Sequence, residues 1–266
     1  MFKRFFAHII FAFCICISQI VFASDMAREK RIADNIKDSL IIGEVMMLKA
    51  NNDEFIALIN NEEPDIIRGS VIILHGMGSN PNAPQIVHPL RSQLAELGWI
   101  TASIQLPITA QDASISENLA LIKESGPRIQ SALNYMHENY KNTRCVLIAH
   151  SLGSIMTASF LASQEKKACD AVVLIGLPTL PSDLPEANSV ELIKKINIPT
   201  LDIYGSQDLA SVKKLAPTRK LTLKKNNPLN RQIEIAGADH SFTGLDETLV
   251  RSIHSWLRYV FDETSH

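Results

Sequence analysis

The sequence lacks an excess of basic residues. Its 26 Lys and Arg residues stand against 28 Asp and Glu residues, which gives a formal net charge of -2 at pH 7. Because binding to nucleic acid phosphates needs a basic stripe, this balance excludes nucleic acid as an expected partner. One short basic run, residues 219–225, reads as a solvated face of the protein and not as a binding surface.

Cysteine is also scarce, with 4 residues in a chain of 266. Cys14 and Cys16 lie in an apolar N-terminal stretch, so a mature chain would keep Cys145 and Cys169. Two scattered cysteines, and histidines without ligand spacing, do not make a zinc site, and we expect neither a metal nor another cofactor. The two remaining cysteines stand near the starts of neighbouring apolar runs, which leaves both a disulfide and two buried free thiols open.

The sequence contains no internal repeat, no low-complexity tract and no interdomain linker. Its length of 266 residues and hydrophobic fraction of 46% suffice for one large domain with a sizeable core. The glycine-containing segment 76–81 lacks the third glycine of a dinucleotide-binding fingerprint, and no P-loop lysine is present. We therefore expect a single α/β domain over residues 24–266 that does not bind a nucleotide through these motifs.

The N-terminal segment 1–23 has the pattern of an export signal. Lys3 and Arg4 precede an apolar stretch over residues 5–22, and residues 21–23 offer the small side chains that a signal peptidase reads. This pattern predicts a periplasmic or secreted protein whose mature chain begins at Ser24. An uncleaved membrane anchor is the alternative, because the apolar stretch is near the roughly 18 residues that a spanning helix needs. Contact with a membrane is expected only in that case.

The apolar pattern predicts antiparallel strands first and then strands that alternate with helices. Residues 44–49 and 54–59, joined by turn residues, read as a β-hairpin. The strands expected after it are 70–74, 99–104, 145–149, 171–175, 199–204 and an edge strand at 232–235. The expected helices are 84–97, 116–140 with an interruption at Gly126 and Pro127, one directly after residue 153, a short one within 178–197, and 245–261. Residues 25–37 are polar and compatible with a helix, and they read as a surface lead-in. This order predicts a mixed, mostly parallel sheet with helices on both faces.

The turn at residues 149–153 ends a buried strand and opens a helix. Its sequence, Ala-His-Ser-Leu-Gly, matches the nucleophile-elbow pattern G-x-S-x-G except that alanine, the next smallest residue, replaces the first glycine. Such an elbow holds the central serine, here Ser151, in a strained conformation, and small flanking residues let the strand and the helix approach. An ordinary turn in which Ser151 caps the helix is the alternative.

Polar residues follow four of the expected strands, and these ends are where reactive groups gather in such sheets. They are His75, Ser151, Asp208 and His240. Ser, Asp and His occur along the chain in the order of the α/β-hydrolase catalytic triad. On these residues the chain resembles the α/β-hydrolase superfamily over essentially the whole mature sequence. Its short connections and export signal resemble an exported bacterial branch of that superfamily.

The resemblance implies that Ser151 is the nucleophile, that His240 takes its proton, and that Asp208 fixes the histidine tautomer. Two neighbouring residues compete for these roles. Asp202 could replace Asp208, but it lies inside an apolar strand. His150 could act as the base, but a side chain next to the nucleophile on a tight elbow points elsewhere.

The resemblance also implies an oxyanion hole made by the backbone N–H groups of Met77 and Leu152. His75 would support its turn without taking part in the chemistry. The glycines that would let the backbone approach a substrate or a neighbouring segment are Gly76, Gly78 and Gly153.

The implied activity is that of an exported serine hydrolase, most simply a carboxylic-ester hydrolase that forms an acyl-enzyme from a small-molecule ester or acyl substrate. Thioesterase and peptidase activities stay open. A non-catalytic binding protein on the same fold is the alternative. The usual cap position, residues 176–198, is short, so we expect an open site for short-chain, soluble esters. Its expected wall residues are Leu106, Leu177, Leu180 and Leu184.

Overall fold

A computed structural model describes residues 24–60, 66–140 and 144–263. The described strands form one 8-stranded sheet in the order β1-β2-β4-β3-β5-β6-β7-β8. The strands are β1 (Glu44–Ala50), β2 (Asp53–Asn60), β3 (Gly69–Leu74), β4 (Trp99–Ile104), β5 (Cys145–His150), β6 (Ala171–Ile175), β7 (Thr200–Gly205) and β8 (Arg231–Ile235). The helices are α1 (Met26–Ser39), α2 (Val87–Glu96), α3 (Ile115–Asn139), α4 (Leu152–Ala162), the 3-10 turn η1 (Pro185–Ala187), α5 (Ser189–Lys195), α6 (Ala210–Lys213), α7 (Ala216–Asn226) and α8 (Asp246–Glu263).

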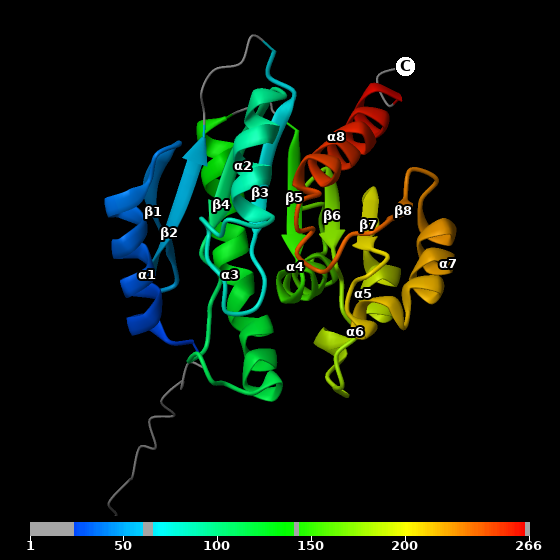
Figure 1. Ribbon diagram of the computed structural model, residues 1–266, viewed down its shortest axis with the longest axis horizontal. Coiled ribbons are helices and arrows are strands. Elements are labelled where there is room, and N and C mark those ends of the chain that lie inside the picture. The colour runs from blue at the N-terminus through cyan, green and yellow to red at the C-terminus, as the bar shows by residue number, and fades with distance from the viewer. Residues whose placement is uncertain (1–23, 61–65, 141–143, 264–266) are drawn as a thin grey trace, which may run out of the picture.

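The predicted mixed sheet is confirmed. β1 and β2 form the expected antiparallel hairpin, and β2 runs antiparallel to β4, while the pairs from β4 to β8 are parallel. Figure 1 shows β2 running opposite to β5 and β6. The carboxyl ends of β3 to β8 therefore meet at one edge of the sheet, where the loops after them can bring side chains together.

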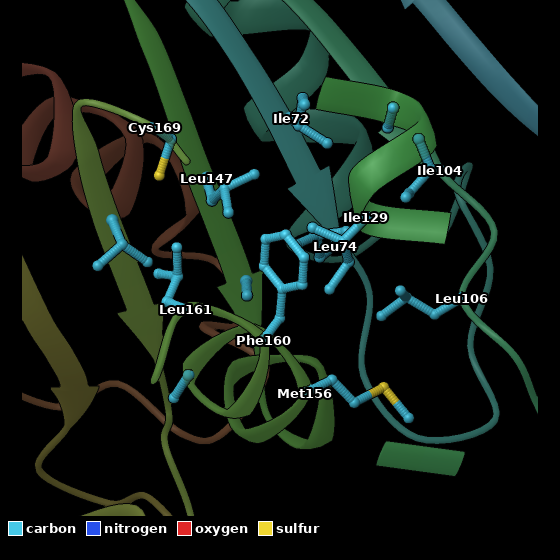
Figure 2. Close-up of a cluster of buried hydrophobic side chains, with 14 of the residues drawn as sticks. Ile72, Leu74, Ile104, Leu106, Ile129, Leu147, Met156, Phe160, Leu161 and Cys169 are labelled. Carbon is cyan, nitrogen blue, oxygen red and sulfur yellow. The ribbon is translucent and has the colours of Figure 1, made fainter. Parts of the chain in front are cut away.

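Helices cover both faces of the sheet, as the alternation predicted. On one face, α2 and α8 pack on alternate side chains such as Val71 of β3 and Ile148 of β5. On the other face, α3, α4 and α5 pack on the intervening side chains. Figure 2 shows Phe160 and Met156 of α4 in this second core, with Ile72, Leu74 and Leu147 of the sheet. Both faces of the central strands are buried, and for this reason the strands are continuous apolar runs in the sequence.

Two predicted helix boundaries are wrong. The helix expected at 84–97 begins at Val87, because Ile86 takes a left-handed φ of 64°. The interruption expected at Gly126 and Pro127 is absent, and α3 is continuous through both residues. Proline costs about 3 kcal/mol in a helix interior, but both halves of α3 bury apolar side chains in one core, and this packing outweighs the local cost.

The basic run 219–225 is not simply a solvated face, because Arg219 is fully buried in α7. Its Nε donates to Asp202 Oδ2 at 2.8 Å, and both side chains are 0% exposed. The strand aspartate that competed for a catalytic role therefore neutralises a buried cation.

The expected surface lead-in, residues 25–37, is the helix α1 with a buried side. Glu29, Ala33 and Ile36 are buried, and the last two pack on Ile56 and Leu58 of β2. Glu29 pairs instead with a residue of α3, described below. The polar composition hid this face because a buried glutamate looks like a surface residue in sequence.

Cys145 and Cys169 are free thiols in the structure. Burial raises the pKa of Cys145 to about 12 and that of Cys169 well above its usual value. The predicted export signal, residues 1–23, lies outside the described residues. Within the described part of the chain, none of the helices is long and apolar enough to cross a membrane.

Candidate active site

Ser151 stands at the sharp turn between β5 and α4. Its φ of 54° and ψ of -121° are rare for a residue with a side chain. The Ser151 N–H donates to the carbonyl of Ile175, the last residue of the neighbouring strand β6, at 2.9 Å. A Cβ at Gly153 would collide with the His75 carbonyl, so a glycine is required there. The Ser151 side chain makes no helix-capping hydrogen bond, and the alternative of a plain capped turn is therefore wrong.

A chain of hydrogen bonds joins Ser151, His240 and Asp208. The distance from Ser151 Oγ to His240 Nε2 is 2.9 Å, and that from His240 Nδ1 to Asp208 Oδ1 is 2.6 Å. Since an ionised carboxylate can only accept, we assign the proton to Nδ1, which leaves Nε2 free to accept from the serine hydroxyl. The three residues come from the loops after β5, β7 and β8.

The Asp208 carboxylate is buried and held by hydrogen bonds. Its residue exposure is 3%, and its Oδ1 also accepts the Leu209 N–H at 2.7 Å. Gly176, with a left-handed φ of 55°, passes beside the pair. A Cβ at this glycine would lie 3.0 Å from His240 Cε1 and 3.3 Å from Asp208 Oδ2. The Nδ1 edge of the imidazole is therefore closed in, while the His240 side chain as a whole stays 20% exposed.

The turn at residues 76–79 lies directly beside the serine. A Cβ on Gly76 would be 3.2 Å from Ser151 Cβ. The turn is closed by the Ser79 N–H on the Gly76 carbonyl at 3.3 Å, and Gly78 has the φ of 63° that its place in such a turn favours. Met77, between the two glycines, is 42% exposed. Leu152 is the first residue of α4, where a helix has backbone N–H groups without intrahelical acceptors.

His75 holds this turn from below. Its Nδ1 lies 2.7 Å from the Gly76 carbonyl oxygen, and its Nε2 lies 3.0 Å from the Leu106 backbone nitrogen. Nδ1 must donate and Nε2 accept in this arrangement, which fixes a neutral tautomer. Burial lowers the pKa of His75 to about 4, in agreement with a neutral ring. In a trans peptide the carbonyl and the N–H point in opposite directions, so the hydrogen bond to the Gly76 carbonyl also orients the Met77 N–H.

His150 contacts the candidate base, which the sequence did not indicate. Its Nε2 lies 2.9 Å from the His240 carbonyl oxygen, and the two rings lie 4.7 Å apart between centroids. Burial lowers the pKa of His150 to about 4, so it donates this hydrogen bond as a neutral ring. Because its Nε2 is bonded to the His240 carbonyl, His150 is not placed to take the Ser151 proton. Its position beside Ser151 in the sequence did not show this contact. The pairing spans 90 residues, and no sequence spacing could have revealed it.

The expected wall residues are corrected in part. Leu106 and Leu177 are 1% and 0% exposed and belong to the hydrophobic core. Leu180 is partly buried against that core, and Leu184 is 41% exposed. Loop position alone misplaced the first two, because the backbone of a loop can be at the surface while its leucine turns inward.

Asp239, next to His240, accepts the N–H groups of Ser241 and Thr243 at 3.0 and 2.9 Å. It therefore shapes the loop that carries His240. Within the described part of the chain, no group of three or more His, Cys, Asp and Glu side chains could hold a metal ion.

The arrangement has the parts that acyl transfer requires. A serine hydroxyl faces a histidine nitrogen that can take its proton, and a buried carboxylate orients that histidine and balances the charge it would gain. Backbone N–H groups beside the serine can receive an oxyanion.

A sequence model of the family described as "Protein of unknown function (DUF3530)" matches residues 23–126 and 110–259. No curated protein matches the chain. Solved structures share its fold at low identity. Est1E from Butyrivibrio proteoclasticus is 13% identical, with a TM-score of 0.64 over 82% of this chain and 99% of that one. The Pyrococcus furiosus esterase Pf2001 is 17% identical, with a TM-score of 0.66 over 84% of this chain and 95% of that one.

A third similar structure is XC6422 from Xanthomonas campestris, described as an α/β serine hydrolase without lid. It is 13% identical, with a TM-score of 0.59 over 85% of this chain and 96% of that one. These likenesses establish the α/β-hydrolase fold, whose sheet and helices are those described above.

Proposed function

The chain belongs to the family described as "Protein of unknown function (DUF3530)" and has the α/β-hydrolase fold, and we propose that it is a serine hydrolase that cleaves carboxylic esters. One observation carries the proposal. It is the unbroken series of hydrogen bonds from Ser151 through His240 to Asp208, at 2.9 and 2.6 Å. A fold alone does not imply an activity, but this geometry is what a hydroxyl needs to become a nucleophile.

In the first half-reaction, Ser151 Oγ attacks the ester carbonyl carbon while its proton passes to His240 Nε2. The carbonyl electrons move to oxygen, and the Met77 and Leu152 N–H groups stabilise the resulting oxyanion. Collapse of this intermediate breaks the bond to the alkoxy oxygen, which takes the proton from His240 and leaves as the alcohol. The acyl group then remains on Ser151.

In the second half-reaction, a water molecule gives its proton to His240 Nε2 and attacks the acyl carbon. Expulsion of Ser151 Oγ, with return of that proton, releases the carboxylic acid. Asp208 stays ionised throughout and stabilises the imidazolium that forms twice per cycle.

The proposed substrates are small, soluble esters with short acyl groups. The segment between β6 and α5 contains only the short turn η1, so it offers no long cap over the serine. Met77, Leu184 and Leu209, on loops at this edge of the sheet, expose 42%, 41% and 51% of their surfaces. These exposed side chains can contact an apolar acyl or alkoxy group of a substrate.

Export to the periplasm or the medium is part of the proposal and rests on the pattern of residues 1–23. N-terminal sequencing of protein recovered from its native host tests it. A first residue at or near Ser24 is expected, whereas intact Met1 in the membrane fraction would identify an anchor instead.

The proposal is tested with a serine-directed fluorophosphonate and a panel of nitrophenyl esters of increasing acyl length. We expect labelling of the wild type at Ser151, no labelling of Ser151→Ala, and faster hydrolysis of the short esters. A clear preference for long, micellar esters would contradict the substrate class. A folded wild type that resists labelling and hydrolyses no ester, thioester or amide would favour a non-catalytic binding protein.

A further inference from the structure

The turn beside Ser151 is held from outside by an arginine of the N-terminal helix. Arg28 Nη2 donates to the Gly78 carbonyl at 3.0 Å, and Nη1 donates to the Thr109 carbonyl at 2.7 Å. The two carbonyls belong to the loops after β3 and β4, and they lie 50 and 81 residues from Arg28 in sequence. The guanidinium thus ties together two loops at the carboxyl edge of the sheet.

The backbone that carries Arg28 is itself fixed to the second of these loops. The Asp25 N–H donates to the Ile108 carbonyl at 2.6 Å, and the Ile108 N–H donates to Glu29 Oε1 at 3.1 Å. Glu29 Oε2 accepts from Arg128 Nη1 at 2.6 Å, and both side chains are 5% exposed. Because the first turn of α1 is anchored on both sides of Arg28, its guanidinium is held in place before any substrate binds.

The hydrogen bond from Arg28 restrains the backbone of the turn that contains Met77. His75 fixes the carbonyl of the Gly76–Met77 peptide, and Arg28 fixes the carbonyl of the Gly78–Ser79 peptide, two peptide groups further along the same turn. Gly78 has a left-handed φ of 63° and no side chain, so without a partner its backbone can take many other conformations. A donor on the Gly78 carbonyl restricts that freedom. The same peptide group carries the Ser79 N–H, which donates to the Gly76 carbonyl, and the Gly76 carbonyl shares its own peptide group with the Met77 N–H. Arg28 thereby helps to hold the Met77 N–H in one orientation.

We propose that Arg28 is a positioning residue for the oxyanion-binding turn at residues 76–79, and that the N-terminal helix is thereby a working part of the active site. This inference rests on the proposed serine hydrolase function. Arg28 acts through the turn and not on the substrate, so its loss should weaken stabilisation of the transition state more than binding of the ground state.

The test compares Arg28→Met, which keeps the aliphatic length but removes both hydrogen bonds, with Arg28→Lys, which can restore one. Arg31→Met, at an exposed position of the same helix, is the matched control. Removal of a whole oxyanion donor costs about 100-fold or more in kcat. For loss of its support we expect about a tenfold fall in kcat for Arg28→Met with KM nearly unchanged, a smaller fall for Arg28→Lys, and wild-type values for Arg31→Met.

Two further measurements separate the possible failures. The rate of fluorophosphonate labelling should fall in parallel with kcat, because the phosphonyl oxygen occupies the same oxyanion site. Circular dichroism and the thermal midpoint should report that both Arg28→Met and Arg28→Lys are folded. A wild type that is not labelled contradicts the proposed function itself. A wild type that is labelled, with a folded Arg28→Met variant of equal kcat and labelling rate, contradicts the role of Arg28 alone.

Discussion

Asp202 and Asp208 lie on β7 and on the loop that follows it, and both carboxylates are fully buried. Asp202 pairs with Arg219, whose side chain is 0% exposed and whose Nη1 donates inward to the Val212 carbonyl. Asp208 pairs with His240, whose side chain is 20% exposed and contacts Ser151. An arginine does not release its proton in a protein, whereas a histidine exchanges one readily. The partner, and not the burial of the carboxylate, therefore distinguishes a structural pair from a candidate catalytic one.

The largest expected effects come from breaking the second pair. Ser151→Ala and His240→Ala should each lower kcat by roughly 10⁴-fold or more, and the double variant should cost little beyond either, because both act in one proton transfer. Asp208→Asn should lower kcat by roughly 10³- to 10⁴-fold, since an amide favours the wrong histidine tautomer. Initial rates on a short nitrophenyl ester measure all four variants.

The control for these variants is Asp202→Asn, which changes the same chemical group on the strand that precedes the Asp208 loop. It should retain most of the activity per folded molecule. If Asp202→Asn inactivated the folded protein and Asp208→Asn did not, the assignment of the two aspartates would be reversed.

Changes to the Asp202–Arg219 pair should alter the stability of the protein and not its activity. Arg219→Met leaves the Asp202 carboxylate buried without its counter-charge, although Gln232 still donates to it at 2.7 Å. Loss of one partner of a buried pair costs about 3–5 kcal/mol, while replacement of both by apolar residues is often neutral. We therefore expect Arg219→Met to lower the free energy of unfolding in urea by about that amount, and Asp202→Leu with Arg219→Met to recover most of it. A double variant no more stable than the single one would show that the pair stabilises the fold by more than mutual neutralisation.

Much of this organisation could be predicted from the sequence because it depends on local patterns. Continuous apolar runs located the parallel strands, and the turn after Ala149 located Ser151. Asp208 and His240 were found because they follow strands, and parallel strands bring their carboxyl ends to one edge.

The remainder depends on contacts between distant segments. Arg219 and Asp202 read separately as a surface cation and a misplaced anion, and only the packing of α7 on β7 joins them. The pairing of Glu29 with Arg128 spans 99 residues, so the polar start of the chain gave no sign that it supports a site. Pro127 led to an error of the opposite kind. Its low helix propensity predicted a break in the helix, but the apolar side chains on both sides of it pack in one core and α3 is continuous.

His75 extends the comparison to a buried group that has no charged partner and must stay neutral. Burial lowers its pKa from 6.5 to about 4 in the folded protein, while in the unfolded chain the ring is solvated and titrates near 6.5. As the pH falls below 6.5, the unfolded state therefore takes up a proton that the folded state refuses, and stability is lost down to about pH 4. At about 1.4 kcal/mol per pKa unit, the loss from this one residue is on the order of 3 kcal/mol.

His75→Asn keeps a donor for the Gly76 carbonyl and cannot titrate, so it should be less stable at pH 7 but should lose less stability on acidification. Urea unfolding of the wild type, His75→Asn and the exposed His137→Gln control at a series of pH values between 7 and 4 measures this difference. Equal acid sensitivity of the wild type and His75→Asn would contradict a buried neutral ring beneath the turn.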